Sequence, residues 1–157
     1  MVIFGNSDMK EFVGLCYIGI SREKTDYVIL PFAEDISRGT SVLHAPVIPF
    51  AESKMAQEGC SFLTEHLRNR PKMDAAGIDS LPKPSKPELK KLNQTYRFCQ
   101  ITLLKVSGVQ EEIKIMPLHA KRGWNFDVKA EEIRFYPLPM TNEKFVEALN
   151  AALKIAT

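Results

Sequence analysis

Strand-like segments follow one another directly along this chain, and this order constrains the fold more than any other feature of the sequence. The segment Glu11–Ile20 (EFVGLCYIGI) is apolar at both alternating sets of positions, which is typical of a central strand. A second apolar run, Tyr27–Phe32, follows after six polar residues, so the two runs predict an antiparallel hairpin. Pro31 has no backbone N–H group, and the second strand is therefore expected to end or turn there.

The second half of the chain is again a succession of strands. Tyr96–Val106 and Glu111–Leu118 flank the turn sequence Ser107-Gly108 and predict a second hairpin. Trp124–Val128 and Glu132–Leu138 are expected to be two further strands. Strands in succession, rather than in alternation with helices, predict an α+β fold with a mostly antiparallel sheet of about six to seven strands and two to three helices. A strongly curled or barrel-like sheet is equally allowed.

One long segment has a helical pattern with an interruption. Ala51–Arg70 places apolar residues roughly on one face, but Gly59 lies in its middle. Ser61 is placed to cap a fresh helix over 62–70, so the sequence predicts a helix that is broken at Gly59. The segment before it, Ser41–Phe50, is interrupted by two prolines and is expected to be a short edge strand or an extended crossing.

Two further helices are predicted from their first residues. Ser85 or Pro87 is expected to open a short helix that runs through about Leu92. Thr141 is placed to cap a final helix over Asn142–Ile155, where apolar residues repeat at helical spacing.

Two segments are predicted as loops. Residues 33–40 form the shorter one. Residues 71–87 (PKMDAAGIDSLPKPSKP) hold four of the ten prolines and few large apolar residues, and they predict a long, basic internal loop. Loops of this length are uncommon in a compact domain and are usually functional or disordered.

Size and composition exclude several classes of protein. The 157 residues fit a single domain, 1–157. With 45% hydrophobic and 25% charged residues, the chain is not a wholly disordered protein, a collagen or a disulfide scaffold. No apolar run approaches the ~18 residues of a membrane span, and no apolar signal core is present at the N-terminus.

The three cysteines, Cys16, Cys60 and Cys99, are odd in number and far apart, so they predict reduced thiols rather than disulfides or a metal site. Unpaired thiols favour a reducing compartment, and the protein is expected to be cytoplasmic. Cys60 is the one candidate for a catalytic thiol, because it follows a glycine in a polar stretch. The histidines that could serve it are isolated in the sequence: His44, His66 and His119.

Positive charge is concentrated in residues 68–97, which carry eight basic and three acidic side chains in a chain of net charge +2. A phosphate backbone attracts such clusters, because each neutralised phosphate releases counterions. A second cluster, residues 119–124, combines basic side chains with the only tryptophan, on which a base could stack. The predicted nucleic-acid-binding residues are Arg68, Arg70, Lys72, Lys83, Lys86, Lys90, Lys91, Lys121, Arg122 and Trp124.

A plainer interpretation of these residues stays open. Lysines keep a Pro-rich loop soluble and extended, and Lys121 and Arg122 also fit an ordinary turn between strands. Trp124 begins an alternation with Phe126 and Val128 that is typical of a buried strand face.

Two acid-x-Lys spacings invite comparison with metal-dependent nucleases. Glu112 and Lys114 form one, Asp127 and Lys129 form the other, and both are close enough in sequence to fall on neighbouring strands. The solvent face of an antiparallel strand has the same pattern. The Gly-rich nucleotide-binding motifs, the nucleophile elbow and the zinc-protease helix are absent, and the loop 37–41 is only a weak candidate for a phosphate cradle.

The sequence therefore predicts a non-catalytic nucleic-acid-binding module that uses the basic loop and the 119–124 turn. One alternative is a protein–protein interaction module, such as an inhibitor or accessory subunit, which needs no chemical signature. A second alternative is a small metal-dependent nuclease or endoribonuclease. The expected partner is nucleic acid or a protein, and the sequence predicts no membrane association, catalytic residue, metal or small-molecule cofactor.

Overall fold

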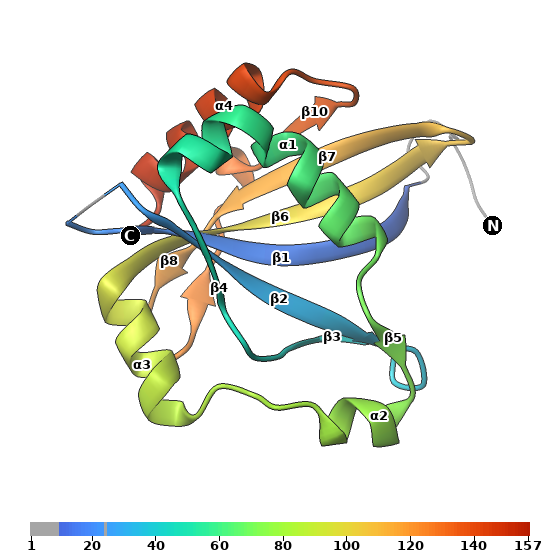
Figure 1. The fold of residues 1–157 in the computed structure, drawn as a ribbon, viewed down its shortest axis with the longest axis vertical. Helices are drawn as coiled ribbons and strands as arrows, with labels where there is room; N and C mark the ends of the chain where they lie inside the picture. Colours follow the sequence, from blue (N-terminus) through green and yellow to red (C-terminus); the bar gives the residue numbers. More distant parts are fainter. Residues whose placement is uncertain (1–9, 24) are drawn as a thin grey trace.

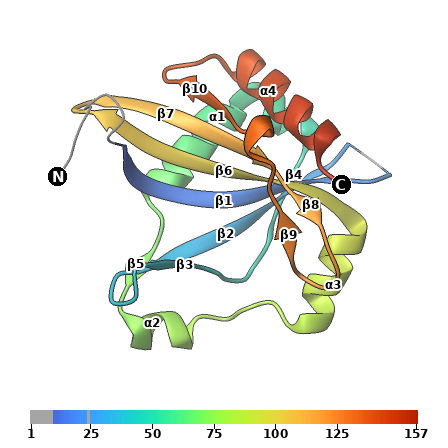
Figure 2. The same ribbon diagram turned by 180° about the vertical axis from the view of Figure 1, so that it is seen from behind.

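The structure is a computed structural model in which residues 10–23 and 25–157 are described. Its strands are β1 (Glu11–Ser21), β2 (Tyr27–Asp35), β3 (Thr40–Leu43), β4 (Ile48–Phe50), β5 (Lys72–Met73), β6 (Tyr96–Ser107), β7 (Gln110–Pro117), β8 (His119–Ala120), β9 (Phe126–Asp127) and β10 (Arg134–Pro137). Its helices are α1 (Glu52–Arg68), α2 (Ala75–Ser80), α3 (Lys86–Thr95) and α4 (Asn142–Ile155), with a 3-10 turn at Ala130–Glu132. Figures 1 and 2 show the two sides of this arrangement.

The main sheet is open and mostly antiparallel. Its strands run in the order β10-β7-β6-β1-β2-β3, with β4 and β5 also paired to β2, and only the β2–β5 pair is parallel. The fold is therefore α+β, as the sequence predicts. The described residues form eight strands in this sheet and four α-helices, more than expected, and the sheet does not close into a barrel.

The central strand and both predicted hairpins are confirmed. β1 lies between β6 and β2, and residues 16–20 pair with residues 27–31. β6 pairs with β7 across a tight turn, in which Gly108 has a φ of +56° that favours glycine. Of the two later strands, β10 pairs with β7, whereas β9 is short and pairs only with β8.

The expected end of the second strand at Pro31 was wrong. The last pair between β1 and β2 joins Cys16 to Pro31, but β2 continues to Asp35 and pairs there with β3 and β5. Because proline has no N–H group to donate, the pairing with β1 stops at Pro31 while the strand itself goes on.

Both segments predicted as loops contain regular structure. Residues 33–35 belong to β2, and residues 71–87 contain β5 and α2. Asp74 caps α2 by accepting a hydrogen bond from the backbone N–H of Gly77 (2.9 Å), and the buried side chain of Ile78 anchors the helix. Lys83 donates to the carbonyl oxygen of Ile78 (2.7 Å). Ile78 is the one buried residue of α2. A six-residue helix with one buried side chain shows no repeat of apolar residues, so its sequence pattern does not indicate a helix.

The predicted break at Gly59 was also wrong, because α1 runs without interruption through it. A Cβ atom on Gly59 would lie 2.6 Å from the sulfur of Met55 and 3.7 Å from the ring of Phe145 on α4. Gly59 therefore leaves room for the Met55 side chain of its own helix, while the Phe145 ring is at ordinary contact distance. The two other helices begin where the sequence predicts, α3 with a capping box of Ser85 and Glu88 and α4 with Thr141 as N-cap.

The main core lies between one face of the sheet and the pair α1 and α4, which Figure 1 shows over the sheet. Cys16 and Ile18 of β1 point into this core, and Phe145 of α4 is fully buried in it. All three cysteines are free and buried. Burial raises the pKa of the Cys16 thiol to about 12, so this thiol stays protonated and acts as a small core residue.

The opposite face of the sheet carries a smaller core. The β8–β9 ribbon lies on this side of the sheet (Figure 2). Val28, Leu30 and Phe98 are buried there. Tyr17 packs against this cluster, and the alternation of β1 places Leu15 on the same face, where it is only half-buried. The two faces of β1 are therefore not equally covered.

The β2–β3 turn is organised by Asp35, whose side chain is fully buried. Its carboxylate accepts hydrogen bonds from the backbone N–H groups of Ser37 (3.0 Å) and Arg38 (3.1 Å) and pairs with the Arg38 guanidinium. Arg38 also reaches Asp79 on α2 (3.0 Å). The amides of Ser37 and Arg38, which the sequence offers as a weak phosphate cradle, are thus already bound to a carboxylate.

We expect Asp35 to make stability depend on pH. Burial raises its pKa, but the hydrogen bonds from Ser37 and Arg38 outweigh that effect and bring the pKa from 3.8 down to about 2. A carboxyl with a lowered folded pKa stabilises the fold above its unfolded pKa, and this contribution is lost as the pH falls from about 4 towards 2. Urea unfolding midpoints measured across this range should therefore fall more steeply for the natural chain than for Asp35→Asn. Asp79→Asn is the control, and equal slopes for the natural chain and Asp35→Asn would contradict the assignment.

In the part of the chain that the structure describes, no helix is both long enough and apolar enough to span a membrane.

Candidate functional site

The two arginines of the predicted nucleic-acid site at the end of α1 are held in ion pairs. Arg68 donates to Glu111 of β7 (Nη2 to Oε1, 2.6 Å), and this hydrogen bond raises the pKa of the guanidinium. Arg70 pairs with Glu34 of β2 through a side chain that is largely buried, and its guanidinium lies over the ring of Phe12. Both arginines tie strands to the helix end rather than presenting free charge.

Three lysines of the predicted set lie apart from one another. Lys83 donates to the carbonyl oxygens of Ile78 and Leu81, and Lys121 pairs with Asp127 across the β8–β9 ribbon (3.4 Å). Lys72 is exposed on β5, at the other end of the segment that leads to α3. Two of these three lysines are therefore already bound within the chain.

The remaining four cations do come together. The helix α3 exposes three lysines: Lys86, Lys90 and Lys91. Near its end, the side-chain amide of Asn93 donates to the carbonyl oxygen of Gly123 (2.7 Å). This hydrogen bond brings the turn that contains Arg122 to the end of the helix. Arg22, which sequence reasoning did not single out, donates to the carbonyl oxygen of Asn93 (3.3 Å). We name this group the α3 cationic surface: Arg22, Lys86, Lys90, Lys91 and Arg122. Within the described residues, none of its members has an ion-pair partner within 4 Å.

Trp124 lies in an aromatic cluster on the second face of the sheet. Its ring centroid is 5.5 Å from that of Phe98, 5.0 Å from that of Phe126 and 6.3 Å from that of Tyr17. The side chain is half-buried. These contacts are those of a packing residue, in agreement with the alternation of Trp124 and Phe126 along the sequence.

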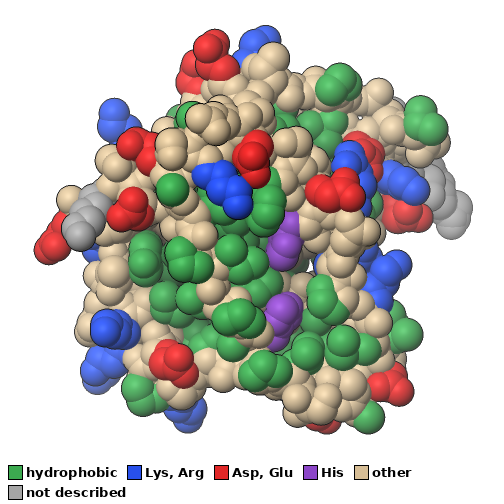
Figure 3. Space-filling view, in the orientation of Figure 1, with side chains coloured by type: hydrophobic (Ala, Val, Ile, Leu, Met, Phe, Trp, Pro, Cys, Tyr) green, Lys and Arg blue, Asp and Glu red, His purple; other side chains and the backbone are tan. Residues whose placement is uncertain are grey.

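A hollow of about 530 Å³ lies between α3 and the segment that joins β3 to β4. One wall is formed by Ala45, Pro46 and Val47, and the other by Leu92 and Tyr96. Pro84, Glu88, Lys91 and Thr95 complete the lining. We call this hollow the front groove. Figure 3 shows apolar side chains gathered over the middle of this face, with charged side chains mostly around them.

The α1 helix lines a second hollow of about 580 Å³, which includes Phe62 and His66. The ring of His66 stacks against that of Phe62, with centroids 6.2 Å apart. Burial lowers the pKa of His66, and the proximity of His44, the neighbour of Ala45, lowers it further. The two histidines thus lie close together between the β3–β4 segment and α1.

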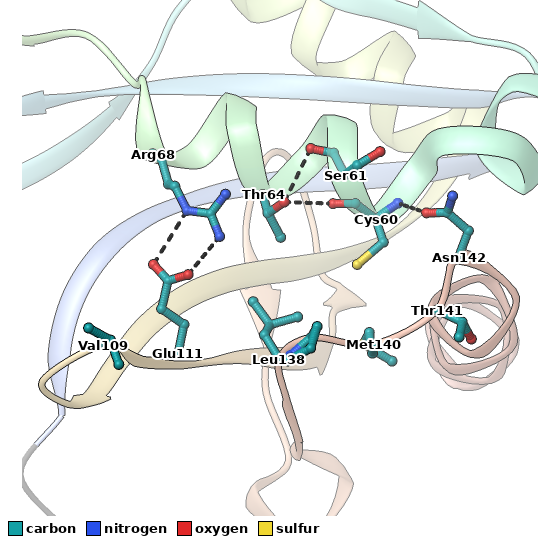
Figure 4. Close-up of a pocket in the computed structure, with 11 residues that line it drawn as sticks. Cys60, Ser61, Thr64, Arg68, Val109, Glu111, Leu138, Met140, Thr141 and Asn142 are labelled. Carbon is teal, nitrogen blue, oxygen red and sulfur yellow. Dashed lines mark hydrogen bonds and ion pairs between the residues drawn. The ribbon is translucent and has the colours of Figure 1, made fainter.

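A third cavity, of about 550 Å³, lies between α1 and the segment that leads into α4 (Figure 4). Its polar groups already bind one another. The hydroxyl of Thr64 donates to the carbonyl oxygen of Cys60 (2.9 Å), and the backbone N–H of Cys60 donates to Asn142 (2.9 Å). The Arg68–Glu111 pair lies on the side opposite Asn142. These side chains join α1 to β7 and α4.

The thiol of Cys60 lines this cavity but has no group to activate it. Burial raises its pKa, although the charge of Arg68 partly offsets this. Among the described residues that line the cavity there is no histidine, and the one carboxylate, that of Glu111, is bound to Arg68. His119 lies elsewhere, with Glu132 (2.6 Å) and Thr157 (3.0 Å) as its partners.

The two acid-x-Lys spacings do not meet. β7, which carries Glu112, pairs with β6 and β10, whereas β9, which carries Asp127, pairs only with β8. Glu112 binds Lys10 (2.9 Å) and Asp127 binds Lys121. Across residues 10–23 and 25–157, no three His, Cys, Asp or Glu side chains are grouped so that they could hold a metal ion. The two pairs therefore do not lie on neighbouring strands, although their closeness in sequence would allow it.

Sequence reasoning missed the front groove because its two walls come from separate segments. Ala45–Val47 precede α1, whereas Leu92 and Tyr96 lie at the end of α3. The prolines at positions 46 and 84 indicate segments that are neither helix nor central strand. They do not indicate which segments face each other in the fold.

No protein-family model matches this chain, and no curated protein sequence matches it. Among solved structures it is similar to a protein of unknown function, NMB0488 from Neisseria meningitidis. The two chains have 12% sequence identity and a TM-score of 0.60, and the likeness covers 99% of this chain and 100% of the other. At this identity the comparison shows a shared fold, and that fold extends over the whole of both chains.

Proposed function

We propose that this chain is a non-catalytic protein-binding module, of the kind that an inhibitor or an accessory subunit requires, and that its partner binds at the front groove. The strongest support for protein binding is that the groove is open to solvent and lined mainly by apolar side chains. Hollows of this size, lined by apolar side chains and bordered by charged ones, are typical of binding sites. The large apolar side chains that are most exposed, such as Val109 and Ile36, lie outside the groove.

The pairing of the predicted cations favours a protein over a nucleic acid. A cation that already has a carboxylate partner gains little from a phosphate, because the existing pair must first be broken. Arg68, Arg70 and Lys121 are in this position, and Lys83 is bound to carbonyl oxygens. Trp124 is half-buried and packed against the rings of Phe98 and Phe126, which favours a packing role over base stacking.

A second candidate function, nucleic-acid binding, is favoured by the α3 cationic surface. Five cations for which the described residues provide no ion-pair partner lie along α3 and at its C-terminal end. If all five neutralised phosphates, the logarithm of the binding constant would fall with the logarithm of salt concentration with a slope of about −4 to −5. This surface is smaller than the sequence predicts, and Glu88 lies within it.

Titration with oligonucleotides separates these two functions. Labelled single-stranded and duplex oligonucleotides of about 20 nucleotides are added to the chain at roughly 100 mM salt, and binding is followed by fluorescence anisotropy. We expect no binding at micromolar protein concentration, because four of the nine predicted cations, Arg68, Arg70, Lys83 and Lys121, are already bound within the chain. The control is the same titration at low salt, where weak charge-driven association is allowed.

Binding that persists at 100 mM salt and weakens in the triple variant Lys90→Gln, Lys91→Gln and Arg122→Gln would overturn the proposal and promote the second candidate. Lys105→Gln, Lys144→Gln and Lys154→Gln together make the matched control, since these lysines are exposed on β6 and α4. Each phosphate contact removed should reduce the slope by about one unit.

A further inference from the structure

The segment that joins β3 to β4 forms one wall of the front groove, and its first residue is a histidine. Residues 45–47 line the groove, and His44 directly precedes them. Two backbone hydrogen bonds hold the start of this segment: His44 donates to the carbonyl oxygen of Pro31 on β2 (3.1 Å), and Ala45 donates to that of Pro82 (2.8 Å). The position of the wall therefore depends on contacts made around His44.

The side chain of His44 adds a third contact, and this contact fixes where the ring carries its hydrogen. Nδ1 lies 3.0 Å from the carbonyl oxygen of Ala45. A carbonyl oxygen only accepts hydrogen bonds, so Nδ1 carries the hydrogen and donates it. In the neutral ring Nε2 is then the nitrogen without a hydrogen, and a further proton binds to His44 at Nε2.

The Nε2 atom of His44 lies where a proton has no acceptor. The atom is buried, and it has no hydrogen-bond partner within the described residues. A buried N–H group without an acceptor costs free energy, and a charged one costs more. The protonated ring is therefore stable only if it turns towards solvent, and this movement breaks the hydrogen bond from Nδ1 to Ala45.

A second histidine, His66 of α1, lies close to His44. Its ring stacks on that of Phe62, with centroids 6.2 Å apart. Burial lowers the pKa of His66, and the proximity of His44 lowers it further. Figure 3 shows two histidine side chains, in purple, among apolar side chains on this face. A positive charge on one ring opposes a positive charge on the other.

No carboxylate lies within 4 Å of either ring among the described residues, where the one histidine paired with a carboxylate is His119. On α1, Glu58 and Glu65 line the same hollow as His66, but Glu65 already accepts a hydrogen bond from Asn69 (2.9 Å). The other elements packed here, β2 and the chain before α3, carry charged groups that are bound elsewhere: Glu34 to Arg70, Asp35 to Arg38, and Lys83 to two carbonyl oxygens. A proton on either ring therefore gains no ion pair.

We propose that His44 and His66 form a pH-sensitive latch on the wall of the front groove. Near neutral pH the ring of His44 holds residues 45–47 in the position that lines the groove. In mild acid, protons bind to the two histidines, the ring of His44 leaves its contact with Ala45, and the wall is released. The effect on a partner rests on the proposed protein-binding function: binding at the groove weakens in acid.

The direction of this effect follows from linkage between protonation and conformation. A histidine whose pKa is lowered in the folded chain, as that of His66 is, contributes stability that is present above its ordinary pKa of 6.5 and is lost as the pH falls through that value. An exposed histidine holds about tenfold more of the protonated than of the neutral form one pH unit below its pKa. The ratio of released to held wall should therefore rise by up to about tenfold for each histidine between roughly pH 7.5 and 5.5.

The wall is tested without any partner, by NMR on the isotopically labelled full chain. Relaxation dispersion detects minor states that exchange on the microsecond to millisecond timescale. We expect dispersion at the amides of Ala45 and Val47 that grows between roughly pH 7.5 and 5.5, and no such change at Ile113, which is buried in β7. Ring nitrogen shifts should show the hydrogen of His44 on Nδ1 in the neutral form.

Two variants that do not titrate in this range separate the latch from a general effect of acid. His44→Asn keeps an N–H donor at the place of Nδ1, and His66→Phe keeps a ring stacked on Phe62. The first should abolish the pH-dependent dispersion and the second should reduce it. His119→Asn is the matched control, because His119 binds Glu132 and Thr157 and does not line the groove. It should behave as the natural chain does, and melting curves check that each variant is folded.

Wall amides that do not respond to pH, or that respond equally in the natural chain and in both His44→Asn and His66→Phe, would overturn the latch. Its effect on binding is measured with a peptide of about 12 residues, selected from a random library on the full chain at neutral pH. Binding at roughly pH 5.5 should be about threefold weaker or more in the natural chain, and unchanged in His44→Asn. Peptide binding at the groove that ignores pH would overturn the latch alone. A pH-dependent wall to which no peptide binds would support the latch and contradict the proposed function.

Discussion

Replacing Ile18 by aspartate should leave little folded protein. Ile18 lies in the middle of the central strand, paired with Ile29 and Cys99, and its side chain is fully buried under α1 and α4. A carboxylate at this position would have no partner in an apolar core, and such changes cost about 4–5 kcal/mol or more. That is a large part of the ~5–15 kcal/mol that stabilises a typical domain. Circular dichroism and urea unfolding measure the loss.

Leu15→Asp is the matched control for this prediction. Leu15 is on the same strand, but it is only half-buried and lies on the face that α1 and α4 do not cover. Its aspartate can reach solvent, so the variant should remain folded and lose less than Ile18→Asp does. If both variants were equally destabilised, β1 would be equally buried on its two faces and the placement of the core would be wrong.

Truncating Phe145 should have the second largest effect. Its ring is fully buried between α4, α1 and the sheet. Removing a buried phenylalanine side chain leaves a cavity and costs about 3–5 kcal/mol, so Phe145→Ala should melt roughly 10 °C below the natural chain. The measurement is a thermal unfolding curve.

Phe135→Ala provides the comparison for Phe145→Ala. Phe135 is 48% exposed on the edge strand β10, where Lys10 lies over its ring. Its removal should cost no more than about 1 kcal/mol. Equal losses in the two variants would contradict the packing of α4 onto the sheet.

Local patterns were sufficient to predict much of the fold. The apolar pattern of residues 11–20, the turn at Ser107-Gly108 and the caps at Ser85 and Thr141 each depend on residues near in sequence, and all four predictions are confirmed. A cap forms or fails through hydrogen bonds within a few residues, so its signal is present in the sequence itself.

Predictions that depend on distant residues were less successful. Gly59 has the local character of a helix break, but α1 continues through it, packed beside Met55 and at ordinary contact distance from Phe145, which is far away in the sequence. The charge of Arg68 is visible in the sequence, but its pairing with Glu111 is not. The basic segment therefore appeared more open than it is, and the front groove, formed by two separate segments, was not visible at all.

The most direct test of the central claim, that a protein segment binds at the front groove, is to locate the binding residues by amide chemical-shift mapping. The isotopically labelled chain is titrated with a peptide of about 12 residues, obtained by selecting a random peptide library on the full chain, and separately with a single-stranded oligonucleotide of similar length, both at roughly 100 mM salt. The account predicts that the peptide shifts the amides of Val47, Leu92 and Tyr96 most, while the oligonucleotide shifts none. Peptide shifts confined to the cavity of Figure 4, or oligonucleotide shifts at Lys90 and Arg122 with the groove unaffected, would contradict it.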